Sequence, residues 1–480
     1  MPGRQLAAIQ HIVHLMLENR SFDHMLGFLY QDSGNVSPAG QPFEGLTGTE
    51  SNLDAAGTAV PVFPIDATQP NAYFMPGANP GEGYTNTNAQ LFGTTTPPSP
   101  PLATCGGFVT NFADAIAYDR LHHHKVVAGT TASDIMGIFP PAALPVLSGL
   151  ARGFAVCDHW YSSVPTETFP NRAFACAATS QGHMNDNTPS FTVPSIFGLL
   201  GSHGVSWKIY GYDAAPLTRM DYPDTASAPD SCFAEFADFQ ADAAAGSLPG
   251  YCFLEPGWKA TGNSQHPNYD VALGEQLIQQ VYNALRAGPG WAQTLLFITY
   301  DEHGGCYDHV PPPTGAVVPD NCVGELGFDF TRFGVRVPAV LVSPLIEAGT
   351  VFRVGDQMTP LDHTSVLATI ERRWGLPALT ARDAAAPDVG DVLTLDAART
   401  DDPLAGVVAP VSSGPGPAAR EVSHIQQVQA ELARDLPIPL PRVPAVRPLA
   451  QLSTPAEYDD YVTARTSAWQ AARAAGEVTG

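Results

Sequence analysis

"IVHLMLEN", residues 12–19, is an apolar run that ends abruptly in a carboxylate and an amide. The run from Ile12 to Leu17 has the length and apolar character of a strand buried on both faces. Such strands are typical of mostly parallel sheets covered by helices, where functional side chains lie beyond the carboxyl ends of the strands. Glu18 and Asn19 stand at that position, so we expect them to belong to a site.

The rest of the chain repeats this pattern of short apolar runs separated by helical stretches. A clear helical stripe with a terminal Gly288 occupies residues 269–288. The further runs are "FAVCDHW" (154–160), "WKIYGY" (207–212), "TLLFITY" (294–300) and "VRVPAVLVS" (335–343). The alternation predicts an α/β fold with a mostly parallel central sheet sandwiched by helices.

Composition divides the chain into two parts. Residues 1–405 are expected to form the catalytic domain, in which residues 31–110, rich in Gly, Pro, Asn and Thr, form a long active-site loop region. Residues 406–480 read as a Pro-rich linker and a helical C-terminal extension. Its last helix should begin at "TPAE", with Thr454 as N-cap and Glu457 completing a capping box.

Charge and hydropathy exclude some partners. The 480 residues carry a net charge of −24, which disfavours nucleic acid because the phosphate backbone would be repelled. No apolar stretch is long enough to span a bilayer, so at most peripheral membrane contact is expected. The first residues lack a signal core, which predicts a cytoplasmic protein or an exported one whose signal is absent from this chain. No protein partner is indicated, and the seven cysteines contain no C-x-x-C pair and are expected to be reduced thiols.

Three segments carry candidate chemistry. The first is Glu18-Asn19, and the second is "TYDEHGGCYDHV" (299–310), where Asp301 and Glu302 end a strongly apolar strand. The third is "SSVPTETFPNRAFACAATSQGH" (162–183), which places Thr168 at the expected N-terminus of a helix, where free N–H groups attract anions.

Together these segments suggest phosphoryl transfer. Glu18, Asn19, Asp301 and Glu302 offer hard oxygen ligands for one divalent metal ion, with Ca, Mg, Mn and Zn left open. A metal beside Thr168 would favour its alkoxide, which could attack phosphorus and form a phospho-threonine intermediate. Asn171 or Arg172 could receive the phosphoryl oxygens. A histidine could protonate the departing alcohol, the candidates being His266, His303 and His309.

Each signal also has a simpler interpretation. Glu18-Asn19 could be a solvated turn, Asp301-Glu302 an ordinary loop before Gly-Gly, and Thr168 a helix N-cap. The occurrence of all three segments in one chain favours the catalytic interpretation.

Four motifs resemble the phosphoesterase family, which holds bacterial and plant non-specific phospholipases C and related acid phosphatases. They are "ENRSFDHMLG", "TFPNR", "DEHGGCYDHVPPP" and "GVRVPAVLVSP", within about residues 9–405. The resemblance implies an α/β sandwich similar to alkaline phosphatase, with Thr168 as nucleophile and metal ligand beside Glu18, Asn19, Asp301 and Glu302. It also implies that His266 lines the phosphate pocket, with His303 and His309 near the substrate.

One position departs from the family. In "NPGEGYTNTNAQLFG" (79–93), Glu82 stands where members often have a histidine. A carboxylate there would repel phosphate unless it were protonated or bound to metal, so the substrate choice is affected more than the reaction type.

The resemblance favours a metal-dependent phospholipase C that releases diacylglycerol and a phosphorylated head group. The alternatives are an acid-phosphatase-type phosphomonoesterase acting on soluble esters, and a non-catalytic binding protein. A lipase needs an apolar mouth, for which the candidates are Phe22, Met25, Leu26, Phe28 and Leu29.

Overall fold

A computed structural model provides the three-dimensional structure. It describes residues 5–122, 126–187, 190–212, 216–258, 262–267, 269–354, 360–414, 422 and 424–478.

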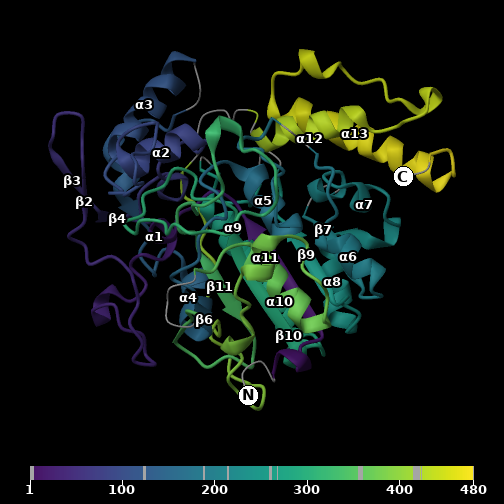
Figure 1. Ribbon diagram of the computed structural model, residues 1–480, viewed down its shortest axis with the longest axis horizontal. Helices are drawn as coiled ribbons and strands as arrows, with labels where there is room; N and C mark the ends of the chain where they lie inside the picture. Colours follow the sequence, from purple (N-terminus) through teal and green to yellow (C-terminus); the bar gives the residue numbers. More distant parts are fainter. Residues whose placement is uncertain are drawn as a thin grey trace.

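The centre of the molecule is a sheet of eight strands, most of them parallel (Figure 1). Only β11 runs against its neighbours β10 and β6 among the described pairs. In spatial order the strands are β12 (Thr350–Val351), β6 (Ala155–Val156), β11 (Ala339–Val342), β10 (Thr294–Tyr300), β1 (His11–Leu17), β9 (Tyr251–Glu255), β7 (Trp207–Gly211) and β8 (Phe233–Glu235). The expected α/β fold with a mostly parallel sheet between helices is confirmed.

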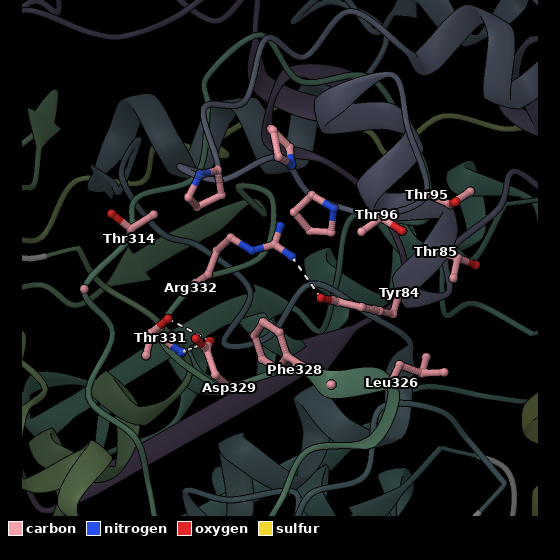
Figure 2. Close-up of a pocket in the computed structure, with 15 residues that line it drawn as sticks. Tyr84, Thr85, Thr95, Thr96, Thr314, Leu326, Phe328, Asp329, Thr331 and Arg332 are labelled. Carbon is pink, nitrogen blue, oxygen red and sulfur yellow. Dashed lines mark hydrogen bonds between the residues drawn. The ribbon is translucent and has the colours of Figure 1, made fainter.

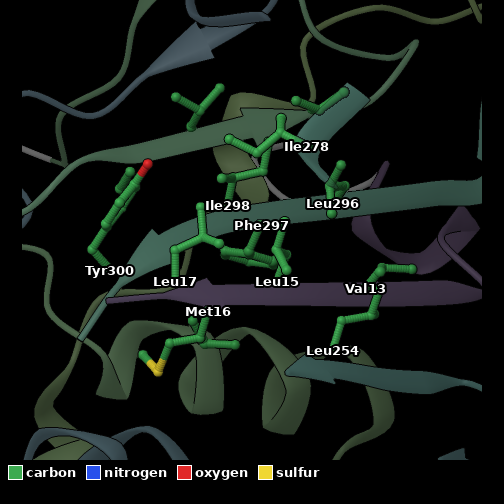
Figure 3. Packing of buried hydrophobic residues seen from close by; sticks show 14 of the residues in the cluster. Val13, Leu15, Met16, Leu17, Leu254, Ile278, Leu296, Phe297, Ile298 and Tyr300 are labelled. Carbon is green, nitrogen blue, oxygen red and sulfur yellow. The ribbon is translucent and has the colours of Figure 1, made fainter. Parts of the chain in front are cut away.

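The two strands beside the site are buried on both faces. β1 pairs in parallel with β10 along its whole length, so that Leu17 lies beside Tyr300 at the same end of the sheet. Their side chains alternate between the two faces of the sheet: Figure 3 shows Leu15 and Leu17 on one side of β1 and Met16 on the other, all of them buried. Because paired parallel strands end at one edge, residues 18–19 and 301–302 emerge together.

Helices cover both faces of the sheet. In Figure 1, α10 crosses in front of the strands and α9 lies behind them. α9 packs on α4 and α8 in one layer, and α10 packs on α5, which contacts α6, in the other. The helices are α1 (Phe22–Leu26), α2 (Tyr84–Phe92), α3 (Phe108–Leu121), α4 (Pro145–Gly153), α5 (Thr168–Ala177), α6 (Ile196–Ser202), α7 (Pro223–Ala226), α8 (Phe236–Ala245), α9 (Val271–Ala287), α10 (Thr364–Trp374), α11 (Ala381–Ala385), α12 (His424–Asp435) and α13 (Pro455–Ala474).

Residues 31–110 contain short elements joined by irregular chain. Beside α2 they include β2 (Ser51–Leu53) paired with β3 (Ala59–Pro61), and β4 (Phe63–Pro64), which pairs with β5 (Gly137–Ile138). This region lies along the same edge of the sheet as the end of β1, because Glu82 from it reaches Asn19.

The C-terminal helices α12 and α13 pack against each other at one end of the molecule (Figure 1). The capping box of Thr454 and Glu457 at the start of α13 is present as expected. None of the helices in the described ranges is long and apolar enough to cross a membrane. All seven cysteines are free, in agreement with the expectation of reduced thiols.

Two expected strands are shorter than their apolar runs. Within "VRVPAVLVS" the regular strand begins only at Ala339, since Pro338 has no N–H to donate to a ladder. Within "FAVCDHW" only Ala155–Val156 pairs regularly. The sequence interpretation missed β9, whose run "YCFLE" is short and follows directly on a Pro-Gly pair.

Candidate active site

The site begins where β1 and β10 end. Asn19 adopts a left-handed backbone conformation with φ 53°, which asparagine tolerates better than most residues. Its backbone N–H donates to Asp301 Oδ1 over 3.0 Å, which ties the two strand ends together. Gly304, with φ +60°, lies so close to the Asn19 carbonyl that a Cβ there would clash. The Gly-Gly pair after Glu302 is therefore needed for this close approach.

Thr168 reaches the strand ends from α5. It is the first residue of that helix and is buried, and its hydroxyl donates to Asn19 Oδ1 over 3.3 Å. The next backbone N–H, that of Phe169, donates to Asp186 Oδ1 over 2.7 Å. The helix N-terminus thus presents the hydroxyl to the predicted oxygen ligands, as the sequence interpretation expected.

Glu82 and His266 enclose the cluster from the other side. Asn19 Nδ2 donates to Glu82 Oε2 over 2.8 Å, and His266 Nε2 lies 3.7 Å from the same oxygen. His266 Nδ1 is 2.8 Å from the Pro267 carbonyl and therefore carries a proton, which leaves Nε2 as the nitrogen directed toward the site. Glu82 thus lies in contact with Asn19 and beside His266.

The carboxylates of the cluster are buried and crowded. Burial raises the pKa of Glu18 to about 7, with His266 opposing the shift and Asp301 adding to it. Burial, then the charges of Glu82 and Asp301, raise the pKa of Glu302 well above its ordinary value. Among the described residues, Glu18 Oε1 and Glu302 Oε1 have no hydrogen-bond partner. Crowded carboxylates with unpartnered buried oxygens are the donor set that a hard divalent cation would satisfy.

Arg172 is the cation that faces this cluster. Its Nε donates to Asp301 Oδ2 over 2.9 Å, and its Nη2 donates to the carbonyls of Met16 and Leu17. Burial raises the pKa of Asp301, and Arg172 opposes the shift. Arg172 therefore holds Asp301 in place, while its Nη1 is buried and has no partner among the described residues.

His303 lies beside Glu302 and does not face the Thr168 hydroxyl. Its Nε2 is 2.7 Å from Gln90 Oε1, and its Nδ1 is 3.2 Å from Glu302 Oε2. The amide nitrogen of Gln90 donates to Gly81 O and Asn111 Oδ1, so Gln90 Oε1 must accept from the ring. Burial lowers the pKa of His303 to about 3, so the ring is neutral and its unprotonated Nδ1 lies beside Glu302.

The prediction that Asn171 receives phosphoryl oxygens is not supported by its contacts. Its side-chain oxygen accepts from the Val164 N–H, and its amide donates to the carbonyls of Val164, Thr166 and Glu167. The side chain is thus fully used in holding the segment that leads into α5, a role that the motif "TFPNR" does not reveal.

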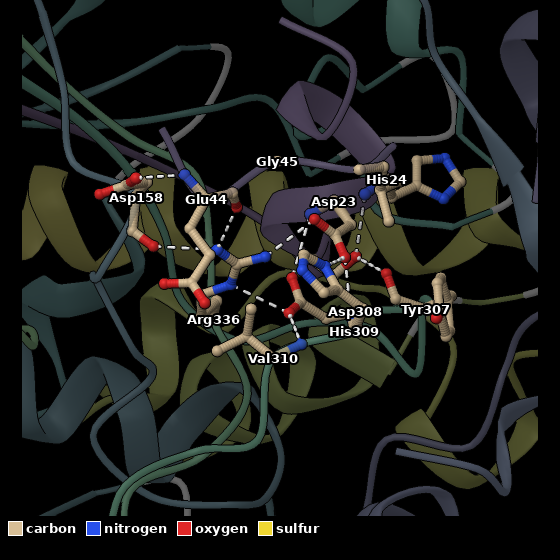
Figure 4. Close-up of polar contacts among 12 residues, drawn as sticks. Asp23, His24, Glu44, Gly45, Asp158, Tyr307, Asp308, His309, Val310 and Arg336 are labelled. Atoms are coloured by element: carbon tan, nitrogen blue, oxygen red, sulfur yellow. Dashed lines mark hydrogen bonds and ion pairs between the residues drawn. The ribbon is translucent and has the colours of Figure 1, made fainter. Parts of the chain in front are cut away.

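His309 belongs to a different network, shown in Figure 4. Its Nδ1 lies 2.6 Å from Asp23 Oδ2, while Arg336 binds Asp23 over 2.8 Å and Asp308 over 2.9 Å. The expectation that His309 meets the substrate beside Thr168 is therefore not supported by its contacts. The sequence interpretation also missed Arg336, although it lies within the fourth motif, because an arginine inside an apolar run gives no sign of its partners.

Asp23, Asp308 and His309 could also hold a metal ion. One ligand atom from each lies within 4.8 Å of the others, and among the described residues this is the only such group of His, Cys, Asp and Glu. Arg336 already supplies a positive charge to both carboxylates, however, so this group is largely balanced without an ion. The ligand atoms of Glu18, Asp301 and Glu302 do not meet this spacing, but Asn19 and Thr168 add neutral oxygens to their cluster.

The chain matches the profile of the Phosphoesterase family over residues 9–377. It belongs to that family. The match spans the ends of β1 and β10, the start of α5 and Glu82, and so contains every residue of the cluster.

Curated relatives cover most of the chain. Non-specific phospholipase C3 of Arabidopsis thaliana is 33% identical over 477 residues, which cover 92% of this chain and 83% of the relative. Phospholipase C A of Mycobacterium tuberculosis is 31% identical over 422 residues, covering 78% and 74%. A solved structure of a protein in the alkaline phosphatase superfamily, from Vibrio parahaemolyticus, has a TM-score of 0.32 at 13% identity and covers 52% of this phosphoesterase and 65% of that chain. A likeness this partial supports no conclusion about the site.

Proposed function

We propose that this phosphoesterase is a phospholipase C that cleaves glycerophospholipids to diacylglycerol and a phosphorylated head group. The observation that carries the proposal is the contact of the Thr168 hydroxyl with Asn19, inside a cluster of buried carboxylates at the carboxyl edge of the sheet. Relatives named phospholipase C are similar to 92% and 78% of this chain. A hydroxyl at a helix N-terminus is well placed to act on phosphorus, because the partial positive charge of the helix end favours the phosphoryl charge.

The proposed ligands of a divalent cation are Glu18, Asn19, Thr168, Asp301 and Glu302. A cation bound there would lower the pKa of the Thr168 hydroxyl and neutralise part of the carboxylate charge. Arg172 keeps Asp301 oriented, and the Gly304 N–H, which donates to Glu302 Oε2, does the same for Glu302. These two contacts hold the ligands on rigid strand ends.

The reaction then uses groups of this chain. Thr168 Oγ1, whose proton would pass to solvent on binding of the cation, forms a bond to phosphorus while the bond from phosphorus to the glycerol oxygen breaks. His266, as the imidazolium with a proton on each nitrogen, donates its Nε2 proton to that oxygen. Water then attacks the phospho-threonine, the bond to Thr168 breaks, and the phosphorylated head group leaves. The imidazole beside Glu82 is the proposed acid in the first step and the base in the second.

A lipid substrate requires apolar surface near the site, and the candidates expected from the sequence are wrong. Phe22, Met25, Leu26, Phe28 and Leu29 are all buried in the core. Leu326, 63% exposed, and Val323, 90% exposed, lie instead on the loop before β11, and the exposed Leu102 lies in the 94–107 loop. We propose that these side chains contact the lipid surface.

Phosphatidylcholine vesicles and p-nitrophenyl phosphate distinguish the proposal from its alternatives. The wild-type protein should release phosphocholine in the presence of a divalent ion, and either a chelator or Thr168→Ala should abolish the release. Turnover of the monoester alone would favour a phosphomonoesterase. Absence of both activities with Ca²⁺, Mg²⁺, Mn²⁺ and Zn²⁺ would favour a binding protein.

A further inference from the structure

A second pocket opens beside α2. It has a volume of about 600 Å³ and is lined by three segments: the start of α2 with Tyr84 and Thr85, the loop 95–101, and the loop 314–332. Figure 2 shows that the Arg332 side chain extends into the space among these segments. Threonine hydroxyls line much of the rest, contributed by Thr85, Thr95, Thr96, Thr314 and Thr331.

Arg332 is a buried cation with incomplete partners. It is 5% exposed, and its Nη2 donates to Asn88 Oδ1 over 2.8 Å and to the Tyr84 hydroxyl over 3.5 Å (Figure 2). The guanidinium lies against the rings of Tyr84, Phe92 and Phe328. Nη1 has no hydrogen-bond partner among the described residues, and no described carboxylate lies within ion-pair distance of the guanidinium. The acidic residue on the pocket lining, Asp329, is exposed and accepts instead from Thr331.

A buried guanidinium in this state favours binding of an oxyanion. The desolvated charge and the unused N–H group both cost free energy, and a carboxylate or phosphate oxygen would offset both. Stacking on aromatic rings fixes the plane of the guanidinium but supplies no hydrogen-bond acceptor for Nη1. The neighbouring hydroxyls can donate to the same anion.

The pocket begins next to the catalytic cluster. Tyr84 lies two residues after Glu82, and two residues of chain span at most about 7 Å. A Cβ on the intervening Gly83 would come within 2.7 Å of Glu167 Oε1, so the start of α2 lies against the residue that precedes Thr168. The start of α2 is therefore common to the surroundings of Thr168 and to the lining of this pocket, and we take the head group of a substrate bound at Thr168 to extend along it.

We propose that the Arg332 pocket binds a second oxyanion carried by the head group of the substrate, such as the carboxylate of a serine head group. The pocket would make this enzyme favour acidic head groups over otherwise equal neutral ones. The inference rests on the proposed phospholipase C function for the placement of the head group, while binding in the pocket can be measured without turnover.

O-Phosphoserine and phosphoethanolamine form a matched pair of probes, since they differ by one carboxylate. Their binding to the Thr168→Ala protein, saturated with a divalent ion, is to be measured by calorimetry, with inorganic phosphate as a third probe. O-Phosphoserine should bind about tenfold or more tightly than phosphoethanolamine, the size expected for a charge-assisted hydrogen bond. Arg332→Gln should remove the difference, and Arg332→Lys should retain part of it.

A second pair of variants tests the pocket without changing Arg332, whose replacement could also disturb the local structure. Thr85 is exposed at the lip of the pocket, so Thr85→Glu should weaken O-phosphoserine binding by repulsion while Thr85→Gln leaves it unchanged. Equal binding of the two probes by the Thr168→Ala protein would overturn the proposal, as would an equal loss of both in Arg332→Gln. Inorganic phosphate binding that falls as much as O-phosphoserine binding in Arg332→Gln would show a free-phosphate site, and would also overturn it.

Measurements of lipid turnover distinguish a failure of the pocket proposal from a failure of the phospholipase C proposal on which it rests. Short-chain phosphatidylserine and phosphatidylethanolamine, used below their micelle concentrations, avoid effects of vesicle charge. Arg332→Gln should lower kcat/KM for the serine lipid alone. If no lipid is cleaved, but O-phosphoserine still binds more tightly than phosphoethanolamine and Arg332→Gln removes the difference, the phospholipase C proposal is contradicted and the pocket proposal is supported. If both lipids are cleaved equally and the probes bind equally, the pocket proposal fails alone.

Discussion

The Thr168 hydroxyl and Asn19 Oδ1 lie 3.3 Å apart, although the two residues are 149 positions apart in the chain. Asn19 is held by the N–H contact to Asp301, and Thr168 is held by the first turn of α5. The two groups are therefore positioned by a strand end and a helix end, which are among the more rigid parts of a fold.

Replacement of Asn19 by glycine should destabilise the protein less than replacement by alanine, but both replacements should abolish most of the activity. Asn19→Ala loses both amide contacts and also places a Cβ in the left-handed region, whereas Asn19→Gly loses the contacts without that backbone cost. We expect Asn19→Ala to be less stable than Asn19→Gly by about 1 kcal/mol. Both variants should lose most phospholipase activity. Urea unfolding and turnover of phosphatidylcholine measure the two effects, and an active Asn19→Gly protein would contradict the assigned role.

Arg172→Met should destabilise the protein strongly. It leaves the buried Asp301 carboxylate without its cation, and breaking a buried pair in this way costs roughly 3–5 kcal/mol. The double variant Arg172→Met with Asp301→Asn removes the uncompensated charge and should recover a large part of that loss. Urea unfolding of the two single variants and the double variant forms the required cycle. Additive losses would show that the two side chains are not coupled.

The His309–Asp23 pair should make stability depend on pH. Burial alone would lower the pKa of His309, but the hydrogen bond and charge of Asp23 raise it above its ordinary value. The folded protein therefore holds this proton more tightly than the unfolded chain, and the contribution is fully present below about pH 6.5 and is lost as the pH rises through the raised pKa. His309→Asn should be more destabilising at pH 5.5 than at pH 9. Urea unfolding at both values gives the comparison, and an equal loss at both would refute the pairing.

The sequence predicted the parts of the site that depend on position along a strand or at a helix end. Glu18, Asn19, Asp301 and Glu302 follow apolar runs, so the parallel pairing of β1 and β10 brings them together. Thr168 was found from its place at the start of a helix.

Side-chain direction was not predictable in the same way. Asn171 turns back to its own loop and His309 turns to Asp23, because local carbonyls and a neighbouring carboxylate offer partners that spacing does not show. The apolar side chains of α1 were expected to face a lipid but are buried in the core. Phe22, for example, contacts the guanidinium of Arg336 and the ring of Phe43. Gln90, which fixes His303, gave no signal in the sequence because its partner lies 213 positions away.

Metal binding provides the sharpest test of which carboxylate group matters, because two clusters in this structure could take an ion. Glu302→Gln keeps the size of the side chain but removes one carboxylate from the cluster at Thr168, whereas His309→Asn removes the histidine of the Asp23 group. We expect Glu302→Gln to weaken binding of a divalent ion at least roughly tenfold, and His309→Asn to leave it unchanged. Calorimetric titration of Mn²⁺ or Ca²⁺ into the metal-free proteins measures this directly.

Stability supplies a second readout that does not depend on turnover. An ion present at 100 times its Kd should stabilise the wild-type and His309→Asn proteins by about 2.7 kcal/mol, and should stabilise Glu302→Gln much less. Arg336 already offsets the charges of Asp23 and Asp308, while Glu18 and Glu302 each keep an unpartnered oxygen among the described residues. Because an ion gains most where carboxylate charge is least compensated, the cluster at Thr168 should bind it first. If the ion stabilised Glu302→Gln but no longer stabilised His309→Asn, the ion would be assigned to the Asp23 group. The proposed activation of Thr168 by a metal ion would then be contradicted.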